Sequence, residues 1–285
     1  MKKLLTLGAV FFVLAGIFLL SLPTILHKAG LHPEYDGPSV ALPGKRALII
    51  TTSHGVLAAP GETEGPATGV MASELTHPYY TFLDGGMEVD VASIRGGEIP
   101  IDPQTLQYMI KSPEDERYLR DTIAQAKVKN SIPIGHVDIA QYDIIFISGG
   151  WGAAYDLAQS PELAAKVSES YYGDKAAVIG GVCHGVLGLV NARARDGSLL
   201  IAGRRMTGVT DKQVKELGIE ITPLHPETAL REAGVVFESQ TAFRDMFATH
   251  VAVDDEQRFV TGQNQNSGLE ASNVMMQLLA ARSEQ

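Results

Sequence analysis

An unbroken apolar run opens the chain. From Leu4 to Leu26 no residue carries a charge, and leucine, valine, phenylalanine and isoleucine dominate. A helix needs about 20 apolar residues to cross a bilayer, so this run is long enough to do so. A cleaved signal peptide has a shorter apolar region that ends in small residues, whereas Pro23, His27 and Lys28 close this one. We predict that residues 1–28 form an uncleaved membrane anchor; the alternative is a cleaved signal ahead of a secreted domain.

The residues on either side of this run predict its orientation and a linker. Lys2 and Lys3 are expected to stay cytoplasmic by the positive-inside tendency, which puts the rest of the chain on the periplasmic or extracellular side. Residues 29–44 contain three glycines and three prolines with little hydrophobic periodicity, which is typical of a linker. The folded domain is expected to occupy residues 45–285.

Within that domain, short apolar runs alternate with helical patterns. Each run is followed by glycine, serine or threonine, and this alternation predicts an α/β fold whose parallel sheet is covered on both faces. Two later apolar stretches flank a polar turn and predict a hairpin. The polar segment 102–141 is predicted to be mostly helical and to form an insertion or cap over one end of the sheet. The expected parallel strands are Ala47–Thr51, Val89–Ala92, Ile144–Ile147 and Ala176–Ile179; the hairpin is Thr249–Val253 with Arg258–Thr261; two helices are Gly69–Asp84 and Leu269–Ala280.

Composition narrows the classes of function. The 285 residues carry a formal charge of -10 and no long basic run, so nucleic acid is a poor partner. The single cysteine, Cys183, can form neither an intramolecular disulfide nor a thiolate zinc site by itself. The histidines show no metal-ligand spacing, and we expect no metal site.

The strongest chemical signal surrounds Cys183. An apolar strand runs into this cysteine, Gly181 and Gly185 bracket it, and an apolar helical pattern follows, as in a nucleophile elbow. A thiol at a helix N-terminus is expected to have a lowered pKa because the exposed N–H groups stabilise the thiolate. The alternative is a small buried hydrophobic residue, which free cysteine often is.

A second glycine pair follows the expected strand that ends at Ile147. Gly149 and Gly150 lie where the ends of parallel strands bind ligands. The backbone N–H of Gly150 could form an oxyanion hole with the N–H of His184, the residue after the cysteine. A plain glycine turn accounts for the pattern equally well.

The chain resembles the ThiJ/PfpI superfamily, the class I glutamine-amidotransferase-like group, and within it the branch of heat-shock chaperones and glutathione-independent glyoxalases. The resemblance implies a flavodoxin-like three-layer sandwich with a mostly parallel sheet, and relatives that are frequently dimers, so a homodimer is possible here. The matching stretches, in family order, are TGVMASELTHP (68–78), GGMEVDVAS (85–93), FISGGWG (146–152) with Tyr155 and Asp156, VIGGVCHG (178–185) and VTGQN (260–264).

By that resemblance Cys183 is the nucleophile and the carboxyl group of Glu74 meets its thiol. Pro78 supports Glu74 independently, because proline has no N–H to give the carbonyl four residues back and should distort the helix there. A carboxyl beside a thiolate should have a raised pKa and could then donate a hydrogen bond to sulfur. A glutamate on a solvated helix face is the alternative for Glu74.

The chain departs from the family pattern at two places. Val214 stands at the usual position of the acidic residue that orients His184. Either Asp211 or Glu216 substitutes for it, or His184 works without an orienting carboxylate. Trp151 stands where many relatives carry histidine, so the pocket wall is expected to be more apolar.

The leading hypothesis is a glutathione-independent glyoxalase that acts on methylglyoxal or glyoxal, a small carbonyl substrate, without metal or organic cofactor. Cys183 would add to the aldehyde, Glu74 or His184 would move a proton through an enediolate, and water would release a hydroxy acid. A second hypothesis is an amidase, peptidase or deglycase with the same cysteine. A third is a holdase chaperone or a redox sensor, with no catalysis.

Overall fold

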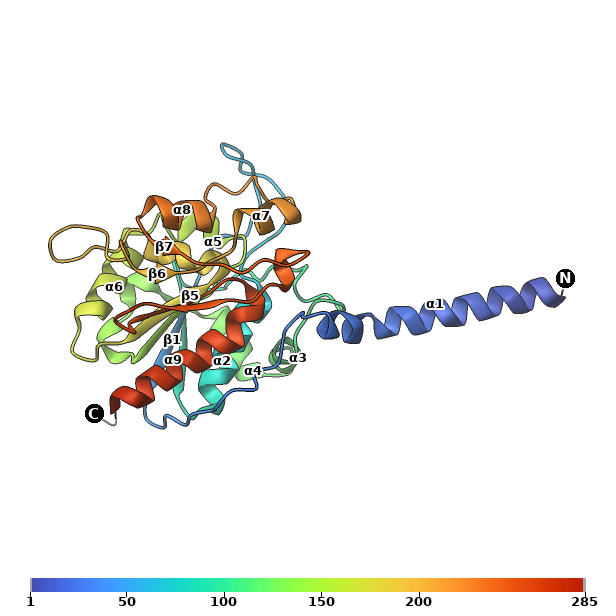
Figure 1. Ribbon diagram of the computed structural model, residues 1–285, viewed down its shortest axis with the longest axis horizontal. Coiled ribbons are helices and arrows are strands. Elements are labelled where there is room, and N and C mark those ends of the chain that lie inside the picture. Colours follow the sequence, from blue (N-terminus) through green and yellow to red (C-terminus); the bar gives the residue numbers. More distant parts are fainter. Residues whose placement is uncertain (1, 284–285) are drawn as a thin grey trace.

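A computed structural model describes residues 2–283. A long N-terminal helix, α1 (Lys2–Lys28), projects away from a single folded body (Figure 1). A seven-stranded sheet of order β3-β2-β1-β4-β5-β9-β8 forms the centre of that body, and every pairing is parallel except β8 with β9. The strands are β1 (Arg46–Thr51), β2 (Glu88–Ser93), β3 (Ile132–Pro133), β4 (Ile144–Ile147), β5 (Val178–Val182), β8 (Val251–Val253) and β9 (Phe259–Gly262).

Helices cover both faces of the sheet because successive side chains of a strand point to opposite faces. In β1, Ala47 and Ile49 belong to one core cluster, whereas Leu48 and Ile50 belong to the other. The first cluster packs under α2 (Ala72–Asp84) and α9 (Gly268–Ser283), and the second under α5 (Ala153–Asp156), α6 (Pro161–Tyr172), α8 (Pro226–Glu232) and a 3₁₀ turn over Cys183–Leu189.

The remaining elements lie at the ends and edges of this sandwich. α3 (Pro113–Tyr118) packs against α2, and α4 (Thr122–Lys129) packs against β2, the strand next to the edge strand β3. The other remaining elements are α7 (Asp211–Leu217), the two-stranded sheet of β6 (Arg205–Met206) and β7 (Val236–Phe237), and 3₁₀ turns η1 (Ile134–His136), η2 (Ile139–Gln141), η4 (Asp245–Phe247) and η5 (Gln265–Ser267).

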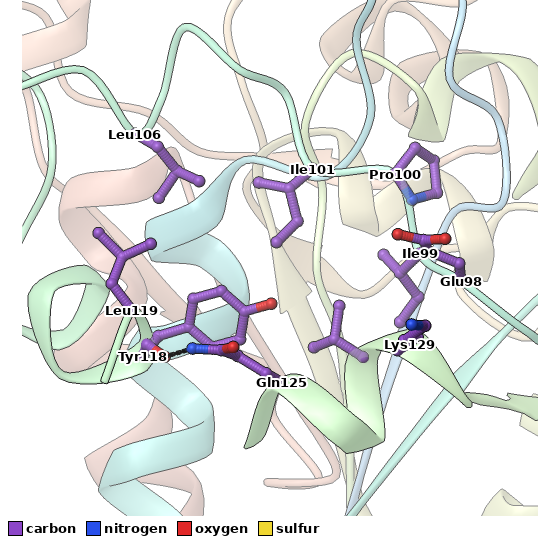
Figure 2. Close-up of a pocket in the computed structure, with 10 residues that line it drawn as sticks. Glu98, Ile99, Pro100, Ile101, Leu106, Tyr118, Leu119, Gln125 and Lys129 are labelled. Carbon is purple, nitrogen blue, oxygen red and sulfur yellow. Dashed lines mark hydrogen bonds between the residues drawn. The ribbon is translucent and has the colours of Figure 1, made fainter. Parts of the chain in front are cut away.

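The predicted strands and the hairpin are confirmed, with shifted ends, and three details differ. The helix expected from Gly69 begins at Ala72, because Gly69 has φ +156° and a Cβ there would lie 1.9 Å from the Pro100 carbonyl oxygen. The segment 102–141 is only partly helical, and it also supplies β3 to the sheet edge. Next to β3, ten residues between Glu98 and Lys129 line an open groove of about 700 Å³, with Leu106, Tyr118 and Leu119 on its wall (Figure 2).

The third difference concerns the expected linker, which packs against the domain. Leu31 and Leu42 are 2% and 7% exposed, so their apolar side chains are withdrawn from water. The His32 backbone N–H donates to the Asn266 side-chain oxygen at 2.9 Å. The residues after α1 therefore lie fixed on the surface near η5.

Candidate active site

Cys183 lies at a strained turn where β5 ends. It has φ +55°, a value that a residue with a side chain rarely adopts, as at a nucleophile elbow. The bracketing glycines are required because β4 lies so close: a Cβ on Gly181 or Gly185 would lie 2.3 or 2.1 Å from the Ile147 carbonyl oxygen. The predicted elbow is therefore present, although a short 3₁₀ turn follows the cysteine instead of an α-helix.

Glu74, on the first turn of α2, meets the Cys183 thiol. Its side chain is fully buried, and its carboxyl group interacts with the thiol and with the backbone N–H groups of Gly149 and Gly150. The Gly149 N–H donates to Oε2 at 3.0 Å. A Cβ on Gly149 would lie 2.6 Å from that oxygen, so the glycine pair after β4 admits the carboxyl group. The solvated helix face considered for Glu74 is excluded.

Ser148 holds the backbone of Glu74 in place. Pro78 lies inside α2 and has no N–H for the Glu74 carbonyl, four residues earlier. The Ser148 hydroxyl donates to that carbonyl at 2.7 Å, and both residues are fully buried. The role of Ser148 was not predicted from the sequence; its signal was the carbonyl that Pro78 leaves without a helical partner.

Burial determines the protonation of the pair. It raises the pKa of Glu74 to about 8, because no water reaches the carboxylate. Burial and the nearby Glu74 charge raise the pKa of the Cys183 thiol, whereas the sequence predicted a lowered pKa. At neutral pH a protonated carboxyl group therefore faces the thiol. The backbone N–H groups of His184 and Gly150 both favour the thiolate, so negative charge that forms on sulfur has donors at hand.

His184 contacts the same sulfur. Its Nδ1 lies 3.4 Å from Cys183 Sγ, and the side chain is fully buried. Burial, and to a lesser extent His225, lower the pKa of His184 to about 3, so the imidazole is neutral at physiological pH. Its Nε2 has no hydrogen-bond partner among the residues that the structure describes.

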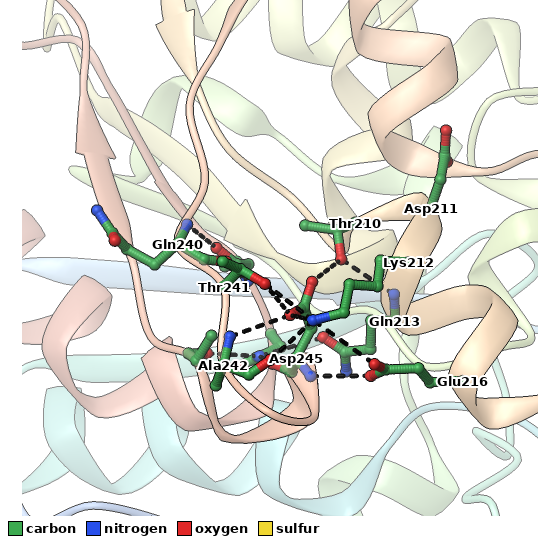
Figure 3. Close-up of polar contacts among 12 residues, drawn as sticks. Thr210, Asp211, Lys212, Gln213, Glu216, Gln240, Thr241, Ala242 and Asp245 are labelled. Carbon is green, nitrogen blue, oxygen red and sulfur yellow. Dashed lines mark hydrogen bonds and ion pairs between the residues drawn. The ribbon is translucent and has the colours of Figure 1, made fainter.

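Neither predicted third member reaches His184. The Asp211 carboxylate accepts from the Thr228 hydroxyl at 2.8 Å, and in Figure 3 it points away from the neighbouring polar cluster. Glu216 accepts from the backbone N–H of Asp245 at 2.8 Å and belongs to that cluster. Within residues 2–283, no carboxylate forms a hydrogen bond or ion pair with the His184 ring, so His184 is arranged without an orienting acid.

Trp151 belongs to the surroundings of the site, and two other kinds of site lie elsewhere or are absent from the described residues. Trp151 is partly buried against the core cluster that contains Cys183. Within the described part of the chain, no group of three or more His, Cys, Asp or Glu side chains could hold a metal ion. The groove of Figure 2 contains none of the site residues.

Comparisons with known proteins show the family and the proteins that this chain resembles. The DJ-1/PfpI family matches residues 66–268. Glyoxalase 3 of Candida albicans is 31% identical over 160 residues, which cover 55% of this chain and 66% of that protein. The glutathione-independent glyoxalase HSP31 of Saccharomyces cerevisiae is 30% identical over 184 residues, which cover 62% of this chain and 73% of that protein. The crystal structure of Rapid Encystment Protein 24 kDa from Francisella tularensis is 33% identical, with a TM-score of 0.74, and the match covers 82% of this chain and 99% of that one.

Proposed function

Because the chain belongs to the DJ-1/PfpI family, we propose that it is a cysteine-dependent, glutathione-independent glyoxalase. It would convert methylglyoxal or a related 2-oxoaldehyde, with one water molecule, to the hydroxy acid. This proposal rests on the buried contacts of Cys183 with Glu74 and His184, with the Gly150 and His184 N–H groups beside the sulfur. The likeness to two curated glyoxalases at 30 to 31% identity supports the choice of substrate class.

The first chemical step forms a hemithioacetal. The Cys183 sulfur bonds to the aldehyde carbon, and neutral His184 accepts the thiol proton through Nδ1, which faces the sulfur. The backbone N–H groups of Gly150 and His184 stabilise the oxygen anion that forms, and Glu74 protonates it. Glu74 thereby becomes a carboxylate next to the carbon from which a proton must leave.

The second step moves hydrogen between adjacent carbons. Glu74 removes the proton from the former aldehyde carbon while protonated His184 neutralises the neighbouring oxygen, which gives an enediol. Glu74 then returns its proton to the second carbon, and His184 takes the hydroxyl proton of the first, which leaves a thioester on Cys183. Water then adds to the thioester carbon and gives a proton to Glu74, while the bond from carbon to sulfur breaks and His184 protonates the departing sulfur, which restores the thiol, the protonated Glu74 and the neutral His184. Electrons move only within the substrate, so this sequence uses no external oxidant or reductant.

We also propose that α1 anchors this enzyme in a membrane, with the catalytic domain on the periplasmic or extracellular side. The helix is apolar and long enough to span, and its side chains from Val10 to Leu20 lie outside the folded body. Exposure of such an apolar surface to water is unfavourable in free energy, whereas the acyl chains of lipid are themselves apolar and can cover it. Secretion after cleavage is the alternative location.

The proposal is tested by incubating the full-length protein, in detergent and without glutathione, with methylglyoxal. We expect loss of methylglyoxal with formation of an equal amount of lactate, and no increase in rate when glutathione is added. The protein is reduced beforehand and freed of reductant, because small thiols react with the aldehyde. A folded, reduced protein that forms no lactate overturns the proposal and directs attention to amide substrates.

A substitution of Ser148 tests how Glu74 is held. Ser148→Ala leaves the buried Glu74 carbonyl without its donor, which should cost about 1 to 3 kcal/mol of stability. We expect kcat for methylglyoxal to fall about tenfold with KM within twofold, because a displaced carboxyl group transfers protons poorly. Ser170→Ala is the matched control, since Ser170 is also buried but its hydroxyl has no hydrogen-bond partner in the described structure. Equal kcat values for the two variants would contradict a positioning role.

A further inference from the structure

The C-terminal part of α1, from Leu20 to Lys28, contacts a loop of the catalytic domain, and we call this part the foot of α1. The contact lies within the apolar run. The Tyr108 hydroxyl donates to the Leu20 carbonyl at 3.3 Å. Leu20 lies six residues before the end of that run, and at 1.5 Å per residue this is roughly 9 Å of helix. A bilayer that covers the run therefore extends to the ring of Tyr108. In Figure 1 the loop before α3 reaches the foot of α1.

This loop is held firmly and presents apolar side chains to the outside. Besides the Tyr108 contact, the Ile110 carbonyl pairs with the His32 ring at 2.6 Å. The loop is therefore attached both to α1 and to the residues that follow α1. Tyr108 and Met109 are nevertheless 56% and 40% exposed. A tyrosine here has the amphipathic character of the aromatic belts at membrane interfaces.

A second loop reaches the same place from the other end of the chain. The Asn266 side-chain amide donates to the Gly30 carbonyl at 2.7 Å and to the Met246 carbonyl at 2.8 Å, which ties residues 243–247 to the chain just after α1. Phe243 in this loop is 96% exposed. The loop is not loose, because the Asp245 carboxylate accepts hydrogen bonds from Thr210, Thr241 and Lys212 (Figure 3).

We infer that Tyr108, Met109 and Phe243 form a membrane-resting surface, which inserts into the interface of the bilayer that α1 crosses. The inference rests on the proposed anchoring of α1. Contact with lipid removes three exposed apolar side chains from water, at about 25 cal/mol for each Å² covered. The occupant is lipid because the loops that carry these side chains are attached to α1 and to the residue just after it, and α1 itself requires lipid.

The surface also sets the orientation of the active site. η5, which contains Asn266, follows the C-terminal end of β9, and β9 pairs with β5, whose C-terminal end carries Cys183. The foot of α1 and the catalytic cysteine therefore lie at the same edge of the sheet. With the loops inserted in the bilayer, the edge of the sheet that carries Cys183 keeps a fixed orientation toward the membrane.

Quenching of tryptophan fluorescence tests the surface. The full-length protein is placed in phosphatidylcholine nanodiscs with or without bromine on the acyl chains, and Tyr108→Trp, Phe243→Trp, Phe12→Trp and Val236→Trp are compared with the parent. Phe12 is exposed within α1 and reports spanning. Val236 is 53% exposed on β7, which lies away from α1 in Figure 1, and serves as control. Trp151 contributes the same background to all of them.

We expect the added tryptophans at positions 108 and 243 to be quenched at least twofold more than the parent protein, and the one at 236 no more than the parent. Strong quenching at position 12 with parent-level quenching at 108 and 243 overturns the membrane-resting surface alone. Parent-level quenching at position 12 overturns the anchor and this surface together. Neither result bears on lactate formation, which is measured separately.

Discussion

Cys183→Ser is expected to lower kcat/KM for methylglyoxal by a factor of at least about 10³. Serine keeps the size and the elbow geometry, but its hydroxyl is a far weaker acid than a thiol and forms no stable anion next to Glu74. The hemithioacetal then has no sulfur on which to form. The measurement is lactate production by wild type and variant, with circular dichroism and thermal unfolding to show that both are folded.

The same variant separates the competing hypotheses. Loss of all activity toward dicarbonyls is expected of a glyoxalase, and a second variant, Cys183→Ala, should behave alike because it too lacks the sulfur. Lactate formation that persists in both variants would refute the proposed nucleophile. Suppression of client aggregation that survives the substitution would indicate a holdase acting through another surface.

Glu74→Gln is expected to reduce kcat by about 10² to 10⁴, the usual contribution of a general acid or base. Glutamine preserves the shape of the side chain, its oxygen can accept from the Gly149 N–H, and its amide can donate to sulfur. It cannot release or recover a proton. Undiminished turnover would reject Glu74 as the base and leave His184 in that role.

The stability of Glu74→Gln relative to wild type should increase as the pH rises. The pKa of Glu74 is about 8 in the folded protein against 4.5 for an exposed glutamate, so between these pH values only the folded state holds the proton. Wild-type stability contributed by this group is therefore full below pH 4.5 and is lost as pH rises toward 8. Glutamine does not titrate, so the difference between variant and wild type should grow across this window by an amount on the order of 4 kcal/mol.

Urea unfolding of both proteins at pH 5 and pH 8 measures this growth directly. His184 and His77, whose pKa values are lowered by burial, contribute to both proteins and cancel in the difference. Glu232→Gln is the control, because Glu232 is exposed on α8 and its substitution should change neither turnover nor the pH dependence. A difference between Glu74→Gln and wild type that stays constant with pH would contradict the raised pKa.

Local patterns predicted most of the elements and the centre of the site. A strand that ends in GGVCHG predicts an elbow, because few other residues permit the chain to turn so tightly against β4. Pro78 indicated that the Glu74 carbonyl would lack its helical donor. The alternation of apolar runs and helical patterns predicted the parallel sheet, since both signals are encoded within a few residues of each other.

Contacts between distant segments could not be predicted in this way. The hydroxyl that replaces the missing donor belongs to Ser148, far from Glu74 in the chain. Asp211 and Glu216 were candidates for orienting His184 because they are near the family's acidic position in sequence. In the fold they bind Thr228 and Asp245 instead, because α7 directs them away from the imidazole.

The sequence by itself therefore determined the apolar helix, the α/β class, the cysteine elbow and the pairing of Glu74 with Cys183, because each is written in adjacent residues or in family motifs. Only the tertiary structure decided how the site is charged. The sequence predicted a thiol of lowered pKa, and the fold raises it, because desolvation depends on all the segments that exclude water from Cys183. The fold also decided where the loops of Tyr108 and Phe243 lie, because contacts between remote parts of the chain tie one loop to Leu20 and the other, through Asn266, to Gly30.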